Sequence, residues 1–362
     1  MNELGTPRDL SVQGLSKSYG SAVAVADVDL EVRAGEFMTL LGPSGSGKTT
    51  TLKLVAGFES PDAGSVLIGD KDVVHLPPHR RGLGVVFQSY ALFPHMSVAQ
   101  NVAYGLKQLR LSRGDRDRRV GEALEIVRMG SMASRRPSEL SGGQQQRAAL
   151  ARAIAHKPPI LLMDEPLGAL DRRLRDSMQL EIRRIHRELG STVVFVTHDQ
   201  EEALSMSDRI AVFDNGTIQQ VGTAEDLYER PRSLFVSEFL GESVQFAGSV
   251  TTTRGSNQLG VEGVTLTCPQ WTGPAAATGT LVIRPERVTL QPKDAVRAPG
   301  ENLLPGVVRE VVYLGSARRV VVGVPGERDV IVREQVSDES RRAGDLVDLR
   351  WSVDHSILLP SA

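Results

Sequence analysis

Cysteine, aromatic residues and long apolar runs are all scarce in this chain of 362 residues. The one cysteine, Cys268, excludes an internal disulfide framework and offers no zinc-binding spacing, as is typical of proteins from a reducing compartment. No run approaches the length needed to cross a bilayer, and Met1 to Gly5 shows no basic region before an apolar core. We therefore expect a protein that stays in the cytosol, with Cys268 as a passive side chain.

An excess of charge of one sign is also lacking, because the formal net charge is −2 and the sequence pI is about 6.4. This balance gives no long-range attraction to nucleic acid, and the locally basic stretch Arg110 to Arg119 is expected to be a solvated surface. From Gly241 onward the aromatic residues are few and scattered, namely Phe246, Trp271, Tyr313 and Trp351. Stacking of nucleic-acid bases requires clustered aromatics, so no nucleic-acid partner is expected.

The first two thirds of the chain indicate an α/β core. The alternating stretch Ala24 to Val32 predicts a strand of a small antiparallel sheet, and a glycine-rich turn joins the strand-like Phe37 to Leu41 to a helix over Lys48 to Ala56. Two short apolar runs, Ile160 to Met163 and Thr192 to Val196, are typical of strands covered on both faces of a parallel sheet. We expect this domain to span residues 1–240.

Three further patterns complete the expected fold. Apolar residues at helical spacing from Leu174 to Leu189 predict a long helix that ends at Gly190. Asp214 to Thr217 contains the Asn-Gly pair of a tight hairpin. Around Gly241 the composition shifts to short runs rich in Val, Thr, Gly and Pro, which predicts a second, all-β domain over 241–362, a small barrel or sandwich.

A complete phosphate-binding loop of the type G-x-x-x-x-G-K-[ST] follows the strand at Phe37. Backbone N–H groups of such a loop wrap phosphates, the lysine reaches the β and γ phosphates, and the hydroxyl after it binds Mg²⁺. The predicted contributors are Gly42, Pro43, Ser44, Gly45, Ser46, Gly47, Lys48, Thr49 and Thr50. The alternative is a glycine loop that only turns the chain. The sequence thus predicts a site for ATP and Mg²⁺.

A second glycine-rich motif, Leu140 to Gln144, opens a helix but lacks the lysine of a phosphate loop. Its Gly-Gly step lets backbone N–H groups approach an anion, and the dipole of the following helix favours negative charge there. Ser141, Gly142, Gly143 and Gln144 therefore resemble half of a nucleotide site. The two halves together imply ATP shared between two copies of the chain.

Polar residues at the ends of the predicted strands supply candidate catalytic groups. Asp164 is placed to hold Mg²⁺ opposite Thr49, and Glu165 to act as a general base for the attacking water; the alternative for both is an acidic turn. His198 ends the next strand, at the edge where catalytic groups of open α/β folds collect, and Gln88 could touch both Mg²⁺ and water. The remaining histidines, which are expected to be surface or capping residues, are His75, His79, His95, His156, His186 and His355.

These motifs, in this order, resemble the ATP-binding subunits of ABC transporters over roughly Leu10 to Leu240. The resemblance makes Tyr19 the residue that stacks on adenine, Gly42 to Thr49 the Walker A loop, and Gln88 the Q-loop residue. Leu140 to Gln144 becomes the signature sequence, within a helical subdomain of about 89–158. The same resemblance matches Asp164 to Walker B, Glu165 to the catalytic glutamate, Asp171 to the D-loop and His198 to the switch histidine. The Gly168-Ala169-Leu170-Asp171 stretch has glycine where many relatives have serine.

The resemblance implies an ATPase that works as a head-to-tail dimer, in which Lys48 of one copy faces Ser141 of the other across ATP. It further implies two transmembrane permease subunits as partners, an extracytoplasmic substrate-binding protein as an indirect partner, and a peripheral position on the cytoplasmic face of the membrane. The exposed apolar stretch Tyr90 to Met96 is expected to receive the permease, with a buried loop as the alternative.

The segment Ile283 to Val288 resembles part of the transport-associated OB-like domain of import ATPases. Phe87 to Met96 and Phe239 to Ser243 look most like the spermidine/putrescine branch, which implies a polyamine cargo. Ferric iron, opines or phosphonates, sulfate and sugars remain alternative cargoes. An exporter subunit and a soluble ABC ATPase with a regulatory C-terminal domain are alternative functions.

Overall fold

The computed structural model describes residues 6–109, 111–168, 170–253, 256–269, 271, 278–326, 328–336 and 341–361. The predictions for Met1 to Gly5, Arg110 and Ala169 lie outside these residues. The chain divides into two compact units, Met1–Glu225 and Asp226–Ala362. The division falls within a short helix, α8 (Ala224–Glu229).

The N-terminal unit is built on a six-stranded sheet with the strand order β10-β9-β3-β8-β7-β6. Its strands are β3 (Phe37–Leu41), β6 (Gly84–Val86), β7 (Ile160–Asp164), β8 (Thr192–Thr197), β9 (Arg209–Asp214) and β10 (Thr217–Gly222). The pairs β3·β8, β3·β9, β7·β8 and β6·β7 are all parallel, as the apolar runs predict. Only the β9·β10 pair is antiparallel, and its turn places Asn215 and Gly216 at φ +45° and +78°, as the predicted hairpin requires.

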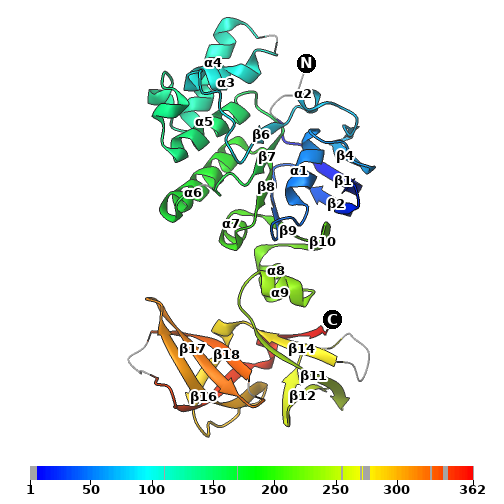
Figure 1. Ribbon diagram of the computed structural model, residues 1–362, viewed down its shortest axis with the longest axis vertical. Helices are drawn as coiled ribbons and strands as arrows, with labels where there is room; N and C mark the ends of the chain where they lie inside the picture. The colour runs from blue at the N-terminus through cyan, green and yellow to red at the C-terminus, as the bar shows by residue number, and fades with distance from the viewer. Residues whose placement is uncertain are drawn as a thin grey trace. The chain divides into compact units, whose positions relative to one another are not determined.

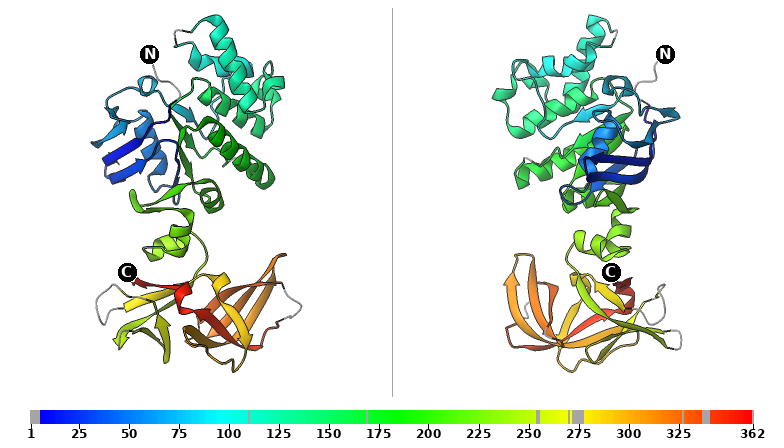
Figure 2. Two further views of the ribbon diagram at one scale, coloured as in Figure 1. Left: turned by 180° about the vertical axis from the view of Figure 1, so that it is seen from behind. Right: turned by 45° about the vertical axis from the view of Figure 1, so that its right-hand side comes forward.

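Helices cover both faces of this sheet, which explains why β3, β7 and β8 are buried along their whole length. On one face Leu52 and Val55 of α1 (Lys48–Ala56) share a core with Leu40 of β3. On the other face Met178 and Ile182 of α6 (Arg172–Leu189) share a core with Phe195 of β8. The views in Figures 1 and 2 show these two helices on opposite sides of β7 and β8. Both helices end as predicted, at Gly57 and Gly190 in the left-handed conformation.

Two smaller groups of elements flank the central sheet. A four-stranded antiparallel sheet, of order β2-β1-β4-β5, consists of β1 (Leu10–Tyr19), β2 (Ala22–Val32), β4 (Ala63–Ile68) and β5 (Lys71–Asp72). The helical group consists of α3 (Val98–Leu106), α4 (Arg113–Ile126) and α5 (Gly142–Ile154). The short helices α2 (Pro78–Arg81) and α7 (Gln200–Met206) complete this unit. Within the described parts of the chain, no helix combines the length and apolar character that crossing a bilayer requires.

The C-terminal unit has two five-stranded antiparallel sheets around one shared core, so the all-β prediction is confirmed. The first sheet, of order β13-β12-β11-β14-β20, consists of β11 (Val244–Thr253), β12 (Ser256–Val261), β13 (Val264–Cys268), β14 (Thr278–Ile283) and β20 (Ser356–Pro360). The second, of order β15-β19-β16-β17-β18, consists of β15 (Thr289–Pro292), β16 (Glu301–Tyr313), β17 (Ala317–Val324), β18 (Arg328–Gln335) and β19 (Leu346–Ser352). Phe246 and Trp351, stacked with ring centroids 5.8 Å apart, join the two sheets in the core.

The segment Ile283 to Val288 contains a buried arginine that connects strand β14 to the first two helices of this unit. Arg284 is only 5% exposed, and its guanidinium donates hydrogen bonds to the carbonyls of Tyr228 and Ser237 at 2.8 and 3.0 Å. The same guanidinium lies 4.0 Å from the centre of the Tyr228 ring. Tyr228 belongs to α8 and Ser237 to α9 (Leu234–Phe239), so this buried cation ties both helices to β14.

Candidate nucleotide-binding and catalytic site

The phosphate-loop sequence forms a tight turn between β3 and α1. Gly45 and Gly47 have φ values of +83° and +100°, a region that other L residues avoid. A Cβ atom at Gly42 would lie 2.3 Å from the carbonyl oxygen of Phe213, and one at Gly47 would lie 2.4 Å from that of Ala24. The glycines are therefore required by conformation and by close backbone contact.

The Lys48 ammonium is held on the inner side of this loop. It is 3% exposed and donates to the carbonyls of Gly42 and Pro43 at 2.8 and 2.7 Å and to Ser46 Oγ at 3.3 Å. Burial lowers the pKa of Lys48, and the nearby carboxylates of Glu165 and Asp164 oppose this shift. A buried cation inside a ring of backbone groups fits the phosphates of a nucleotide.

Thr49 and Asp164 join the phosphate loop to the end of β7. The Thr49 hydroxyl donates a hydrogen bond of 2.9 Å to Asp164 Oδ1. Burial raises the pKa of Asp164, which is 9% exposed, and the negative charge of Glu165 adds to the rise. A hydroxyl and a carboxylate next to each other are the oxygen ligands that Mg²⁺ prefers, so this pair fits that ion.

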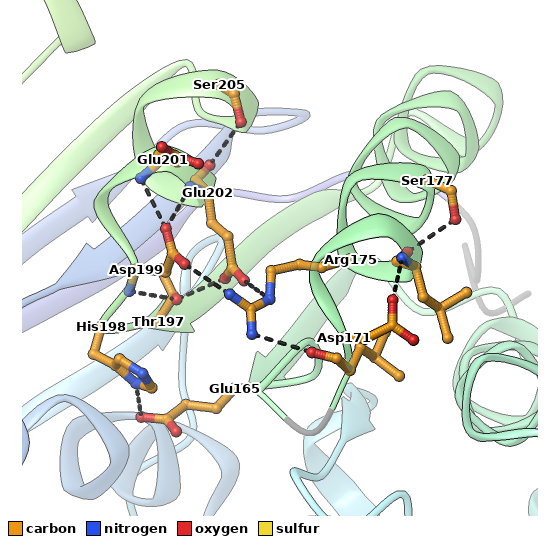
Figure 3. A network of polar contacts seen from close by, with 12 residues as sticks. Glu165, Asp171, Arg175, Ser177, Thr197, His198, Asp199, Glu201, Glu202 and Ser205 are labelled. Carbon is orange, nitrogen blue, oxygen red and sulfur yellow. Dashed lines mark hydrogen bonds and ion pairs between the residues drawn. The ribbon is translucent and has the colours of Figure 1, made fainter. Parts of the chain in front are cut away.

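Glu165 lies at the centre of the predicted catalytic residues. Its backbone has φ +42°, and its N–H donates to the carbonyl of Val196 on β8 at 3.0 Å. One carboxylate oxygen accepts from Gln88 Nε2 at 3.1 Å, and the other lies 3.3 Å from His198 Nδ1. Figure 3 shows His198 and Glu165 pointing toward each other. Three residues that are far apart in the sequence therefore meet at one end of the sheet, with the Glu165 side chain 18% exposed.

Two other predicted site residues have local structural roles as well. Asp171 is the N-cap of α6, where its Oδ1 accepts from the backbone N–H of Leu174 at 2.9 Å. Tyr19 ends β1 and is 49% exposed, with the Lys17 ammonium 5.7 Å from its ring centre. An exposed ring of this kind is available for stacking.

The second glycine-rich motif begins α5. Ser141 is the N-cap and accepts from Gln144 N, and the Gln144 side chain accepts from Ser141 N at 2.9 Å. Gly143 is buried, and a Cβ there would lie 3.0 Å from Leu174. In Figures 1 and 2, α5 lies beside α3 and α4, whereas α1 lies beside β1 and β2. The two predicted halves of the nucleotide site thus belong to different groups of elements within one chain.

The loop after Gln88 is exposed or half-buried over Ala91 to Met96, as the sequence predicts, and departs from the prediction at Tyr90. Tyr90 is 8% exposed and therefore buried, while Pro94 and His95 are exposed. Tyr90 and Ala91 both have positive φ, +58° and +47°. Arg152 of α5 donates to their two carbonyls at 2.9 and 2.7 Å, and so holds this unusual backbone in place.

Two of the histidines expected to be surface or capping residues are packed against the core instead. His186 Nε2 lies 3.1 Å from the carbonyl of Gly35, and its ring meets Phe37 edge-on at 5.3 Å. Burial lowers the pKa of His156. In the described part of the chain neither histidine has a hydrogen bond or ion pair with Glu165, so their packing is structural.

Sequence reasoning missed Arg175, which lies close to His198. Its guanidinium donates to Asp199 Oδ2 at 3.1 Å and to the carbonyl of Leu170 at 3.2 Å. Its Nε lies 3.6 Å from Glu202 Oε1. The one available signal was its position in the first turn of the helix that Asp171 caps.

Known proteins resemble this chain over nearly its whole length. The family model for the ABC transporter matches residues 25–168, and the TOBE domain model matches residues 281–359. A spermidine/putrescine import ATP-binding protein PotA from Thermobifida fusca is 48% identical, with 97% of this chain and 93% of that protein covered. The protein of the same name from Rubrobacter xylanophilus is 43% identical, with 99% and 95% covered.

Solved structures resemble the N-terminal unit. The dimeric structure of MJ0796, a bacterial ABC transporter cassette, is 32% identical with a TM-score of 0.54 and covers 59% of this chain and 98% of its own. A post-hydrolysis state of the same cassette bound to ADP and Pi has a TM-score of 0.53. With relatives this similar over nearly its whole length, the chain belongs to the ATP-binding proteins of ABC transporters, in the group that includes the PotA proteins.

Proposed function

We propose that this protein hydrolyses ATP to ADP and phosphate and uses the energy to drive import of polyamines through a membrane complex. The observation that carries the proposal is the position of Glu165, between Gln88 and His198 and within the electrostatic reach of Lys48. A carboxylate at this point can accept a proton from water that attacks the γ-phosphate of a nucleotide on the loop.

Each residue of the site has a role in this reaction. Lys48 and the loop N–H groups bind the phosphates, and Glu165 takes the proton of the attacking water. Gln88 and His198 hold the Glu165 carboxylate from its two sides, and His198 would also hydrogen-bond the γ-phosphate. Thr49 and Asp164, with Gln88, would hold Mg²⁺, which supplies positive charge that stabilises the transferred phosphoryl group.

We further propose that two copies of the chain share the nucleotide. Ser141 and Gly142 are exposed, and the first N–H groups of α5 that follow them suit an anion. Because α5 and α1 belong to different groups of elements, the two motifs complete one site when a second copy is turned head-to-tail. The dimeric form of the related MJ0796 cassette supports this arrangement.

The partners and cargo follow from the relatives. We propose two transmembrane permease subunits, which bind near the loop that follows Gln88, with the protein on the cytoplasmic face of the membrane. The names of the relatives support spermidine and putrescine as cargo over iron, opines, sulfate and sugars, and they favour import over export. An extracytoplasmic binding protein would deliver the polyamine to the permease.

Uptake of labelled putrescine and spermidine tests this function directly. Cells that lack the gene are complemented with the wild type or with Glu165→Gln, whose side chain keeps the shape but lacks the base. We expect uptake to return with the wild type alone. If uptake is independent of the gene, polyamine cargo is wrong. ATP hydrolysis by the purified wild type would then show that the ATPase assignment still holds.

A further inference from the structure

We propose that Arg175 is a positioning residue that couples the loop before α6 to the segment that carries His198. This inference rests on the proposed ATPase function. The guanidinium group touches both segments at once, with Leu170 on one side and Asp199 on the other. Figure 3 shows Arg175 extending from α6, beside Asp171, toward Asp199 and Glu202.

On the side of the loop, Arg175 acts on the backbone. Its Nη2 donates to the carbonyl of Leu170, the residue directly before Asp171. Its own backbone N–H donates to the carbonyl of Asp171 at 2.9 Å, and the Asp171 side chain caps the same helix. The position of Asp171 is therefore fixed to the first turn of α6, from which Arg175 extends.

On the side of His198, Arg175 contacts Asp199 directly and is linked to Thr197 through Glu202. Asp199 accepts from Arg175 Nη1 and also caps α7 through the N–H groups of Glu201 and Glu202. Thr197 donates to Glu202 Oε2 at 2.6 Å and accepts from Asp199 N at 3.0 Å. His198 lies between two residues whose positions depend on this network.

The positive charge of Arg175 compensates the negative charges of Asp199 and Glu202 in this network. Glu202 is 3% exposed, and it faces Asp199, Arg175, His198 and the Thr197 hydroxyl. Burial and the negative charge of Asp199 raise the pKa of Glu202, and Arg175 and the hydrogen bond from Thr197 oppose this rise. Without Arg175, two carboxylates remain beside each other with less compensation, and the segment around His198 is expected to rearrange.

The mechanical consequence concerns the proposed dimer. Asp171 is exposed at the end of the sheet where two copies would meet, so a movement of its loop is passed through one guanidinium to His198. His198 contacts Glu165 from the segment that this network holds in place. Closure of the dimer and alignment of the base are thereby linked within one chain.

Steady-state hydrolysis by Arg175→Ala, Arg175→Lys and Arg183→Ala tests the coupling. Arg183 is the matched control because it also joins α6 to the α7 region, through the carbonyl of Ser205, without touching the residues around His198. We expect Arg175→Ala to lower kcat roughly 10- to 100-fold, with KM for ATP within about twofold. Arg175→Lys should keep an intermediate kcat, since one ammonium cannot bridge all three acceptors. Arg183→Ala should match the wild type.

Hydrogen exchange of the same purified variants is independent of activity. We expect Arg175→Ala to speed exchange in peptides that contain Leu170 and in those that contain His198, and Arg183→Ala to change neither. An unchanged kcat in Arg175→Ala, or faster exchange on one side only, would overturn the coupling. A wild type that binds ATP without hydrolysing it would refute the proposed function, and the exchange result would still decide whether Arg175 links the two segments.

Discussion

His198 Nδ1 lies 3.3 Å from Oε1 of Glu165, and Gln88 Nε2 lies 3.1 Å from the other oxygen of the same carboxylate. The glutamate is thus held at both oxygens by side chains from two other segments. Its own backbone, at φ +42°, is fixed by a hydrogen bond to β8. The proposed base is therefore oriented by side chains and backbone of this chain.

The first prediction concerns His198→Ala. Loss of the imidazole removes one of the two groups that orient Glu165, and also the proposed hydrogen-bond partner of the phosphate. We expect kcat to fall by about 100-fold or more, with a small change in KM, because Lys48 and the loop still bind the nucleotide. Measured rates of phosphate release over a range of ATP concentrations check this. Wild-type kcat in the variant would contradict the role of His198.

The second prediction compares two glycines of the phosphate loop. In Gly42→Ala the new methyl group would lie 2.3 Å from a backbone oxygen of Phe213, so backbone must shift. In Gly45→Ala no atom lies within 4 Å of the new methyl, and the cost comes from φ +83° alone. We expect about 1–2 kcal/mol of destabilisation for Gly45→Ala and clearly more for Gly42→Ala. Denaturant unfolding measures both, and equal losses would refute the steric argument.

The third prediction concerns the loop that Arg152 holds. Arg152→Ala leaves the carbonyls of Tyr90 and Ala91 without their charged donor and should destabilise the protein by roughly 1.5–3 kcal/mol. Ala91→Gly removes the steric cost of φ +47° and should offset part of that loss in the double variant. Ala103→Gly, within α3, is the matched control and should add to the loss instead. Unfolding curves of the single and double variants separate these outcomes.

The fourth prediction uses the lone cysteine. Cys268 is buried at the end of β13, and burial raises its pKa to about 11. At about pH 8 the thiolate fraction in the folded protein is very small, so a thiol reagent should react much more slowly than with the unfolded chain. Because the folded pKa exceeds the unfolded one, the unfolded state loses its proton first, and stability should fall as pH rises from about 9 toward 11. Rapid labelling of native protein would contradict the burial of Cys268.

The local patterns of the sequence were sufficient for the elements that position the site. The apolar runs at Phe37, Ile160 and Thr192 predicted strands of an α/β core, and Gly57 and Gly190 predicted the ends of two helices. These signals are local, because each depends on a few adjacent residues and on burial on both faces. The strand order itself depends on packing between distant segments and was not predicted.

The contacts of long polar side chains with distant segments could not be predicted from the sequence. Nothing adjacent to Arg175 in the sequence indicates that it reaches Asp199, and nothing near Arg152 indicates a contact with Ala91. Both arginines lie on amphipathic helices, where charged residues are usually solvated. The prediction of an exposed Tyr90 failed for a related reason, since a loop that folds back on a neighbouring helix has no periodic signal.

The central claim is that Glu165 is the base for ATP hydrolysis. The most direct test measures phosphate release and ATP-dependent dimer formation in parallel for the wild type and Glu165→Gln, with light scattering to give the mass. We predict that the variant loses hydrolysis yet forms a stable dimer with ATP, because Lys48 and the loop still bind the phosphates. Hydrolysis at the wild-type rate in Glu165→Gln would contradict the account.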